Sequence, residues 1–201
     1  MWSIIQAAGW PIWPLIIASI VALALIFERL YSLRQSLVAP AGMVDRVLAE
    51  FRQNGVTPEL LSRTAQQGPL GRILAAGLAN VRSPRPVMKE AIEEVGRIVT
   101  HDLERFLPTL GTIAAIGPLL GLLGTVIGMI EIFGSQSAVG SNPAQLAHGI
   151  SVALYNTAMG LIVAIPSMIF YRHFRGKVDE LVVEMEQQAI KLVDFAHGER
   201  K

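Results

Sequence analysis

The chain has no cysteine among its 201 residues. This absence excludes disulfide bonds, thiolate nucleophiles, Cys-ligated zinc and iron–sulfur clusters. Charged residues are also scarce, at 16% of the chain, against about 25% in an average soluble domain. Hydrophobic residues make up 52%, and the formal net charge is only +1. The composition indicates a membrane protein and gives no sign of a nucleic-acid partner.

Basic residues are missing from most of the chain. Eleven of the 17 lysines and arginines lie between Arg29 and Arg105, and the other six lie between Arg172 and Lys201. Lysine and arginine accumulate on the cytoplasmic side of membrane proteins. The pattern therefore predicts that these two segments and the C-terminus are cytoplasmic and that the N-terminus lies outside.

Three apolar runs separate these segments, and we expect transmembrane helices at 13–30, 107–130 and 149–171. The second and third runs contain no Asp, Glu, Lys, Arg or His, and the first carries Glu28 and Arg29 only at its inner end. Runs of this length cross a hydrocarbon core of about 30 Å. No basic residue precedes the first run, so we expect a retained span rather than a cleaved signal peptide.

The sequence thus predicts an all-α integral membrane protein with three transmembrane helices and long helical cytoplasmic extensions. We expect a periplasmic or interfacial N-terminus at 1–12, where all three tryptophans lie, as in an aromatic belt. We also expect a cytoplasmic helical domain at 31–106, a periplasmic loop at 131–148 and a cytoplasmic C-terminal helix at 172–201. Pro40, Pro58 and Pro84 suit first helical positions, the last two after the capping candidates Thr57 and Ser83.

Two helical patterns extend beyond the spans. Apolar residues recur with a helical period from Val87 to Val99, and we expect this helix to run without a break into the second span. After the third span, apolar residues recur at alternating steps of four and three from Val178 to Ala196, through Val182, Met185, Ala189 and Leu192. This heptad-like seam predicts a continuing helix that packs on partner proteins.

Small and polar residues share one face of each of the last two spans. In the second span these are Gly117, Gly121, Gly124 and Gly128, bordered by Thr125; in the third they are Ala153, Asn156, Thr157, Gly160 and Ala164. Such faces allow close packing of helices. Alternatively, the two threonines, about 9 and 12 Å below the outer ends of their spans, border a hydrated seam. Each hydroxyl could also bond to a carbonyl of its own helix.

The second and third spans resemble a known family at this point. The segments GLLGTVIG (121–128) and GISVALYNTAMGLIVAIP (149–166) are similar to the two signature segments of the ExbB/TolQ/MotA proton-channel family, with ExbB and then TolQ the nearest members. The three-span layout and the large cytoplasmic segment also match. One position departs, because ExbB and TolQ commonly carry a glutamate where this chain has Val152.

The resemblance implies a pentameric ring in the bacterial inner membrane. A single-span partner of the ExbD/TolR type would supply an intramembrane aspartate in the central pore, and a TonB- or TolA-like protein would carry the energy across the periplasm. By motif position, Thr125 and Thr157 match the pore threonines of the family. Asn156 and the glycines Gly121, Gly124, Gly128 and Gly160 are the further predicted pore-lining residues.

The missing charges support this picture independently. A proton path through the membrane needs a titratable group or a file of water, and the second and third spans offer hydroxyls, one amide and one phenol but no carboxylate or imidazole. Alone, the chain should conduct protons poorly. If it conducts, a partner must supply the titrating group.

Candidates at the ends of the spans are weaker. Glu131 and His148 flank the predicted outer loop and suit either a pore mouth or a solvated loop. His101, Asp102, Glu104 and Arg105 lie at the inner interface and suit a cytoplasmic exit, a site for the partner's tail or simple anchoring. No cofactor or metal site is predicted.

The alternatives to a proton channel of the ExbB type are an enzyme, a passive scaffold and other subunits of the same family. An intramembrane enzyme would need a nucleophile with a base, or a metal set, and the spans hold serines without histidine or acid; we therefore expect no enzyme. A passive scaffold is compatible with the spans. A TolQ-type subunit for envelope maintenance and a motility-type stator are alternatives within the family, although MotA-type proteins generally have four spans.

Overall fold

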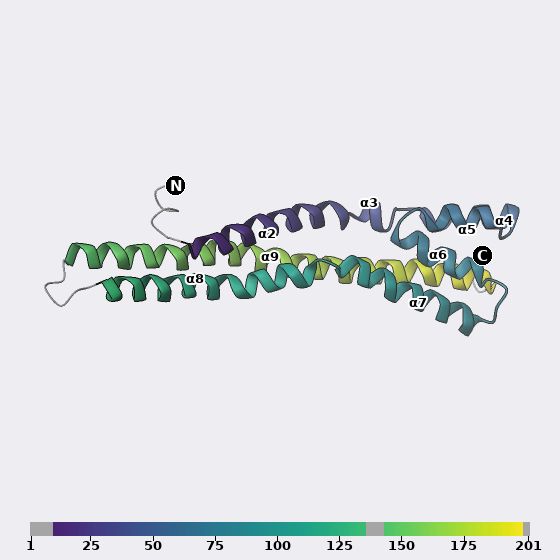
Figure 1. Cartoon of the computed structure of the whole chain (residues 1–201). Helices are drawn as coiled ribbons and strands as arrows, with labels where there is room; N and C mark the ends of the chain where they lie inside the picture. Colours follow the sequence, from purple (N-terminus) through teal and green to yellow (C-terminus); the bar gives the residue numbers. More distant parts are fainter. Residues whose placement is uncertain (1–9, 136–142, 199–201) are drawn as a thin grey trace. The chain divides into compact units, whose positions relative to one another are not determined.

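The computed structural model describes residues 10–135 and 143–198 (Figure 1). The interfacial segment predicted at 1–12 and the middle of the loop predicted at 131–148 therefore lie largely outside the described residues. Within the described ranges the chain forms helices and turns without strands, which confirms the all-α prediction. The helices are α2 (Ile12–Ser32), α3 (Gln35–Val38), α4 (Met43–Asn54), α5 (Pro58–Ala65), α6 (Pro69–Ala79), α7 (Arg85–Glu104), α8 (Leu107–Ser135) and α9 (Pro143–Ala196).

The chain divides into two compact units. The first, here called the apolar unit, comprises Met1–Glu28 and Phe106–His173, and the second, the charged unit, comprises Arg29–Arg105 and Phe174–Lys201. Helices α2 and α9 contribute to both units. The division separates most of the apolar residues from 16 of the 17 lysines and arginines; the exception is Arg172, near the end of the apolar unit.

The apolar unit contains the second and third predicted spans and the first up to Glu28. Among the residues that the structure describes, three helical stretches are long and apolar enough to cross a membrane: Ile12–Ser32, Arg85–Gly134, which includes α7 and most of α8, and Gly149–Ala196. Large apolar side chains on all three are exposed, including Phe27, Leu119 and Ile162. Exposed apolar surface of this extent suits hydrocarbon or another protein rather than water.

Both later helices extend into the segment predicted as a loop. Helix α8 continues to Ser135, and α9 begins at Pro143. The sequence indicated Pro143 as a turn residue, but it is the first residue of α9, where its fixed φ and missing N–H are tolerated. The positions of the membrane boundaries stay predictions.

The charged unit is built around α6, which contacts α3, α5 and α7. Its buried core includes Leu74, Leu78, Met88 and Leu181. An ion pair of 2.9 Å between Arg85 and Asp194 joins α7 to α9.

Much of the tail seam packs inside the chain. Val178, Met185 and Leu192 are buried in the charged unit. A Cβ built on Gly77 of α6 would lie 2.8 Å from Leu192 Cδ2, so α6 and α9 are in close contact. The continuing helix is confirmed. Contacts of the tail with partner proteins stay a prediction, because an apolar stripe does not distinguish helices of the same chain from helices of another.

The helix predicted to run unbroken into the second span is interrupted. Helix α7 ends at Glu104 and α8 begins at Leu107, with Arg105 and Phe106 in a turn. The physical reason is Pro108, which has no N–H to offer the Glu104 carbonyl and whose ring clashes with that carbonyl in a regular helix. The sequence interpretation overlooked this proline.

The predicted helix starts are only partly correct. Thr57 Oγ1 accepts a hydrogen bond of 3.1 Å from Leu60 N, with Pro58 as the first residue of α5. Helix α7 instead has Pro84 as its N-cap, without a side-chain bond from Ser83. Helix α4 begins at Met43 rather than Pro40, after Gly42, whose φ of 70° lies in the left-handed region, which favours glycine.

Candidate functional site: the seam between α8 and α9

Within the apolar unit, α8 and α9 approach each other along a row of small residues. A Cβ on Gly160 would lie 2.6 Å from the Gly117 carbonyl oxygen and 3.1 Å from Gly121 Cα. A Cβ on Gly121 would lie 2.8 Å from the Asn156 carbonyl oxygen. These are backbone atoms that cannot move aside. The prediction that these glycines allow close helix packing is therefore confirmed at these positions. The two helices run antiparallel, since later residues of α8 meet earlier residues of α9.

The groups of α9 that face α8, and their distance from it, change along the seam. Gly124 faces the side chain of Asn156, since a Cβ there would lie 2.9 Å from Asn156 Cγ. Asn156 is only 1% exposed. One turn further on, the contact loosens, because a Cβ on Gly128 would lie 3.6 Å from Ala153 Cβ. Gly124 thus makes room for an amide inside the helix pair.

Thr157 connects the two helices. Its Oγ1 donates a hydrogen bond of 3.4 Å to the Gly121 carbonyl oxygen on α8, a distance beyond the usual range for a hydroxyl donor. The contact across the seam is therefore long and weak. For Thr157, the alternative of a bond within its own helix is wrong.

Thr125 behaves differently. Its Oγ1 donates to the Leu122 carbonyl oxygen of its own helix at 2.7 Å, so for this residue the own-helix interpretation is correct. Thr125 follows Gly121 by four residues, which places both on one side of α8. Because the two hydroxyl hydrogens already serve carbonyls, both Oγ1 atoms present lone pairs as acceptors.

Of the two candidates at the outer ends, the structure describes the side chain of Glu131 alone. Glu131 is exposed near the end of α8. The side chains of His148 and Val152 lie outside the described residues, so their roles stay predictions. Between Leu107 and Ile130, and between Gly149 and Tyr171, the sequence has no acidic or basic side chain and no histidine.

The inner candidates have different surroundings. Asp102 is in an ion pair of 2.6 Å with Arg72 on α6, whereas Glu104 and His101 line a groove between α7 and α9. Arg105 lies in the turn after α7. In the described part of the chain, no group of three or more His, Asp or Glu residues could hold a metal ion.

The sequence interpretation missed one buried charge. Arg29 is 6% exposed, and its Nη1 donates to the Leu103 carbonyl oxygen at 3.0 Å. The sequence marked Arg29 only as the inner end of the first span. No local pattern could have linked it to Leu103, which lies 74 positions away.

Comparison with known proteins identifies the family to which this helix pair belongs. The model of the MotA/TolQ/ExbB proton channel family matches residues 65–187, which include both signature segments and most of α9.

Three relatives show how far the similarity extends. An ExbB-like biopolymer transport protein of Synechocystis is 34% identical over 168 residues, covering 81% of this chain and 79% of that protein. The biopolymer transport protein exbB1 of Vibrio cholerae is 34% identical over 171 residues, 81% of this chain and 74% of its own. The Tol-Pal system protein TolQ of Pseudomonas aeruginosa is 30% identical over 204 residues, 90% and 86% of the two chains. This chain is a member of the MotA/TolQ/ExbB proton channel family.

Proposed function

We propose that the chain is the channel subunit of an inner-membrane complex that couples the proton motive force to a periplasm-spanning, TonB-like transducer for outer-membrane transport. Relatives named as ExbB biopolymer transport proteins support this assignment. In the proposed complex, copies of the chain form a pentameric ring, with N-termini in the periplasm and C-termini in the cytoplasm. A single-span partner of the ExbD/TolR type lies within the ring.

One observation carries the proposal: the seam offers hydroxyl oxygens but no titratable acid. The oxygens of Thr157 and Thr125 can each accept a hydrogen bond, since their hydrogens are directed to the carbonyls of Gly121 and Leu122. A protonated, neutral carboxylic acid needs such an acceptor. An aspartate supplied by the partner would therefore carry the proton, with the two threonine oxygens holding it in its neutral form.

The energy for the transducer comes from the proton crossing the membrane potential. Moving one elementary charge is worth about 2.3 kcal/mol per 100 mV. In the proposed mechanism, each protonation and release of the partner's carboxylate changes its interaction with the ring, and the resulting movement passes to the transducer. The similarity to TolQ over 90% of this chain makes a TolQ-type subunit for envelope maintenance the second candidate.

Replacing Thr157 with valine tests the proposal. Thr157→Val removes the hydroxyl at nearly constant shape, and we expect assembly to be preserved while proton flux in proteoliposomes containing chain and partner falls about tenfold or more, the effect of a loss of ~1.4 kcal/mol. The matched control is Thr112→Val, since the Thr112 hydroxyl bonds to the Pro108 carbonyl of its own helix. Wild-type flux in Thr157→Val would show that the seam is not the proton path.

A further inference from the structure

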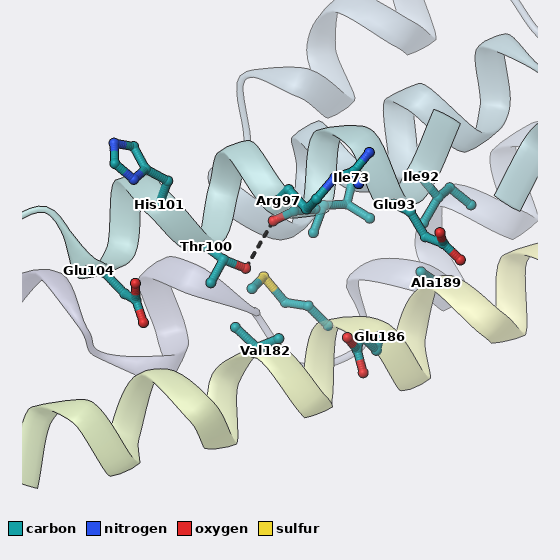
Figure 2. A pocket seen from close by; sticks show the side chains of 12 residues that line it. Ile73, Ile92, Glu93, Arg97, Thr100, His101, Glu104, Val182, Glu186 and Ala189 are labelled. Carbon is teal, nitrogen blue, oxygen red and sulfur yellow. Dashed lines mark hydrogen bonds between the residues drawn. The ribbon is translucent and has the colours of Figure 1, made fainter. Parts of the chain in front are cut away.

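The charged unit contains a groove that the proposed proton path does not use. It has a volume of about 410 Å³ and lies between α7 and α9, with one residue of α6 (Figure 2). Its apolar lining comes from all three helices: Ile73, Ile92, Val182, Met185 and Ala189. The groove therefore offers a hydrophobic floor to a ligand.

Acidic side chains outnumber basic ones around this floor. Glu93 and Glu104 come from α7 and Glu186 from α9, against Arg97 and His101 (Figure 2). Among the residues that the structure describes, none of the three carboxylates takes part in an ion pair or hydrogen bond. Since the fold does not use these charges, the groove has a net negative lining that is available to a cationic ligand.

Gly96 leaves one wall of the groove open. It lies in the interior of α7, where glycine costs stability relative to alanine. A Cβ at this position would meet no atom within 4 Å, so packing within the chain does not require glycine here. The Thr100 hydroxyl donates to the Gly96 carbonyl at 2.9 Å on the same helix (Figure 2). The missing side chain leaves the backbone of α7 accessible from the groove.

An apolar floor beneath unpaired carboxylates fits a segment with apolar residues on one side and lysine or arginine on the other. Anionic lipid is disfavoured by the same carboxylates. In a membrane complex, the cytoplasmic flank of a single-span protein has this chemistry, because lysine and arginine accumulate there beside the apolar span. We propose that the α7–α9 groove binds the basic cytoplasmic juxtamembrane segment of a membrane-anchored partner. The identity of that partner rests on the proposed function. The apolar and acidic lining of the groove is independent of that function.

A labelled peptide tests the site on the full chain in neutral-lipid nanodiscs. The probe is a short fluorescent amphipathic peptide with leucine on one face and lysine on the other, compared with the same peptide carrying glutamate for lysine. We expect saturable binding of the lysine peptide, measured by fluorescence anisotropy, that weakens as salt rises. The glutamate peptide should not bind.

Matched variants distinguish binding in this groove from general attraction between the peptide and the charged surface. Glu93→Lys with Glu186→Lys should weaken binding of the lysine peptide at least about tenfold, an energy of ~1.4 kcal/mol. Glu90→Lys with Glu94→Lys changes the same charge on exposed positions of α7 outside the groove and should leave affinity within about twofold, a change of ~0.4 kcal/mol. Equal weakening in both pairs would overturn the proposal. Gly96→Leu, whose Cβ would meet no atom within 4 Å, should block binding without lowering the unfolding temperature.

Two further outcomes are decisive. If the peptide fails to bind and Gly96→Cys forms disulfide-linked dimers of this chain, the groove belongs to a second copy and the proposal is wrong. Thr157→Val should bind the peptide normally, since it lies in the apolar unit. Normal peptide binding together with full proton flux in Thr157→Val would contradict the proposed function while leaving the groove assignment in place.

Discussion

The guanidinium of Arg29 holds the Leu103 carbonyl oxygen at 3.0 Å, inside the charged unit. Leu103 belongs to the last turn of α7, where carbonyls have no partner within the helix and the helix dipole favours a positive charge. Arg29 thus supplies a donor and a charge at the place where Pro108 prevents the helix from continuing.

Removing this charge should destabilise the protein. Arg29→Met keeps much of the apolar stem but leaves the Leu103 carbonyl without this donor, at an expected cost of about 1–3 kcal/mol. The loss should appear as a lower thermal unfolding temperature in detergent. Arg82→Met, at an exposed position, should change stability by less than about 0.5 kcal/mol; an equal loss in both variants would contradict the role of Arg29.

The close approach of α8 and α9 depends on the glycines. Gly160→Ala places a methyl group 2.6 Å from the Gly117 carbonyl oxygen, and we expect a loss of about 1–3 kcal/mol from overpacking. The comparison is Gly134→Ala, whose Cβ meets nothing within 4 Å and which should be neutral or stabilising by up to ~1 kcal/mol. Thermal unfolding of both variants measures these changes in stability. An unchanged unfolding temperature in Gly160→Ala would mean that α8 and α9 are further apart than in this structure.

The chain alone should be a poor proton conductor. The two spans that form the seam carry no carboxylate or imidazole, and a bare charge at the bilayer centre is costly. Liposomes containing only this chain, with a pH-sensitive dye inside, should show flux close to that of empty liposomes, and addition of the partner should raise it. Strong flux from the single chain would contradict the requirement for a partner's acid.

Membrane orientation can be measured directly because the protein has no cysteine. A membrane-impermeant maleimide should label Ser3→Cys in intact spheroplasts but label Gly198→Cys only after the membrane is permeabilised. The unmodified protein gives the background. The reverse pattern would contradict the orientation predicted from the lysines and arginines.

Helix ends could be predicted from the sequence where the determining residues lie within one turn. Thr57 and Pro58 were predicted correctly because a side-chain cap and a fixed φ act within a single turn. The break between α7 and α8 was also encoded locally, in Pro108, but the uninterrupted apolar pattern around it led to the wrong prediction. The start of α4 depends on Gly42 and its positive φ, which no apolar periodicity reveals.

The hydrogen-bond partners of the two threonine hydroxyls could not be predicted from the sequence. Thr125 and Thr157 occupy similar settings in sequence, yet one bonds to its own helix and the other to the Gly121 carbonyl of the neighbouring helix. A threonine can form either bond at the same backbone geometry. Which bond forms depends on the distance to the facing helix, and that distance is set by the packing of Gly117, Gly121 and Gly160.

The sequence by itself determined the three apolar helices, the absence of ionisable groups at the seam and the family, because span length, charge and signature segments are properties of consecutive residues. The tertiary structure decided that the seam of α9 packs on α6 of the same chain, that Arg29 meets Leu103, and that carboxylates from α7 and α9 line one groove. Those pairings join positions far apart in the chain, and only the packed helices bring them within contact distance.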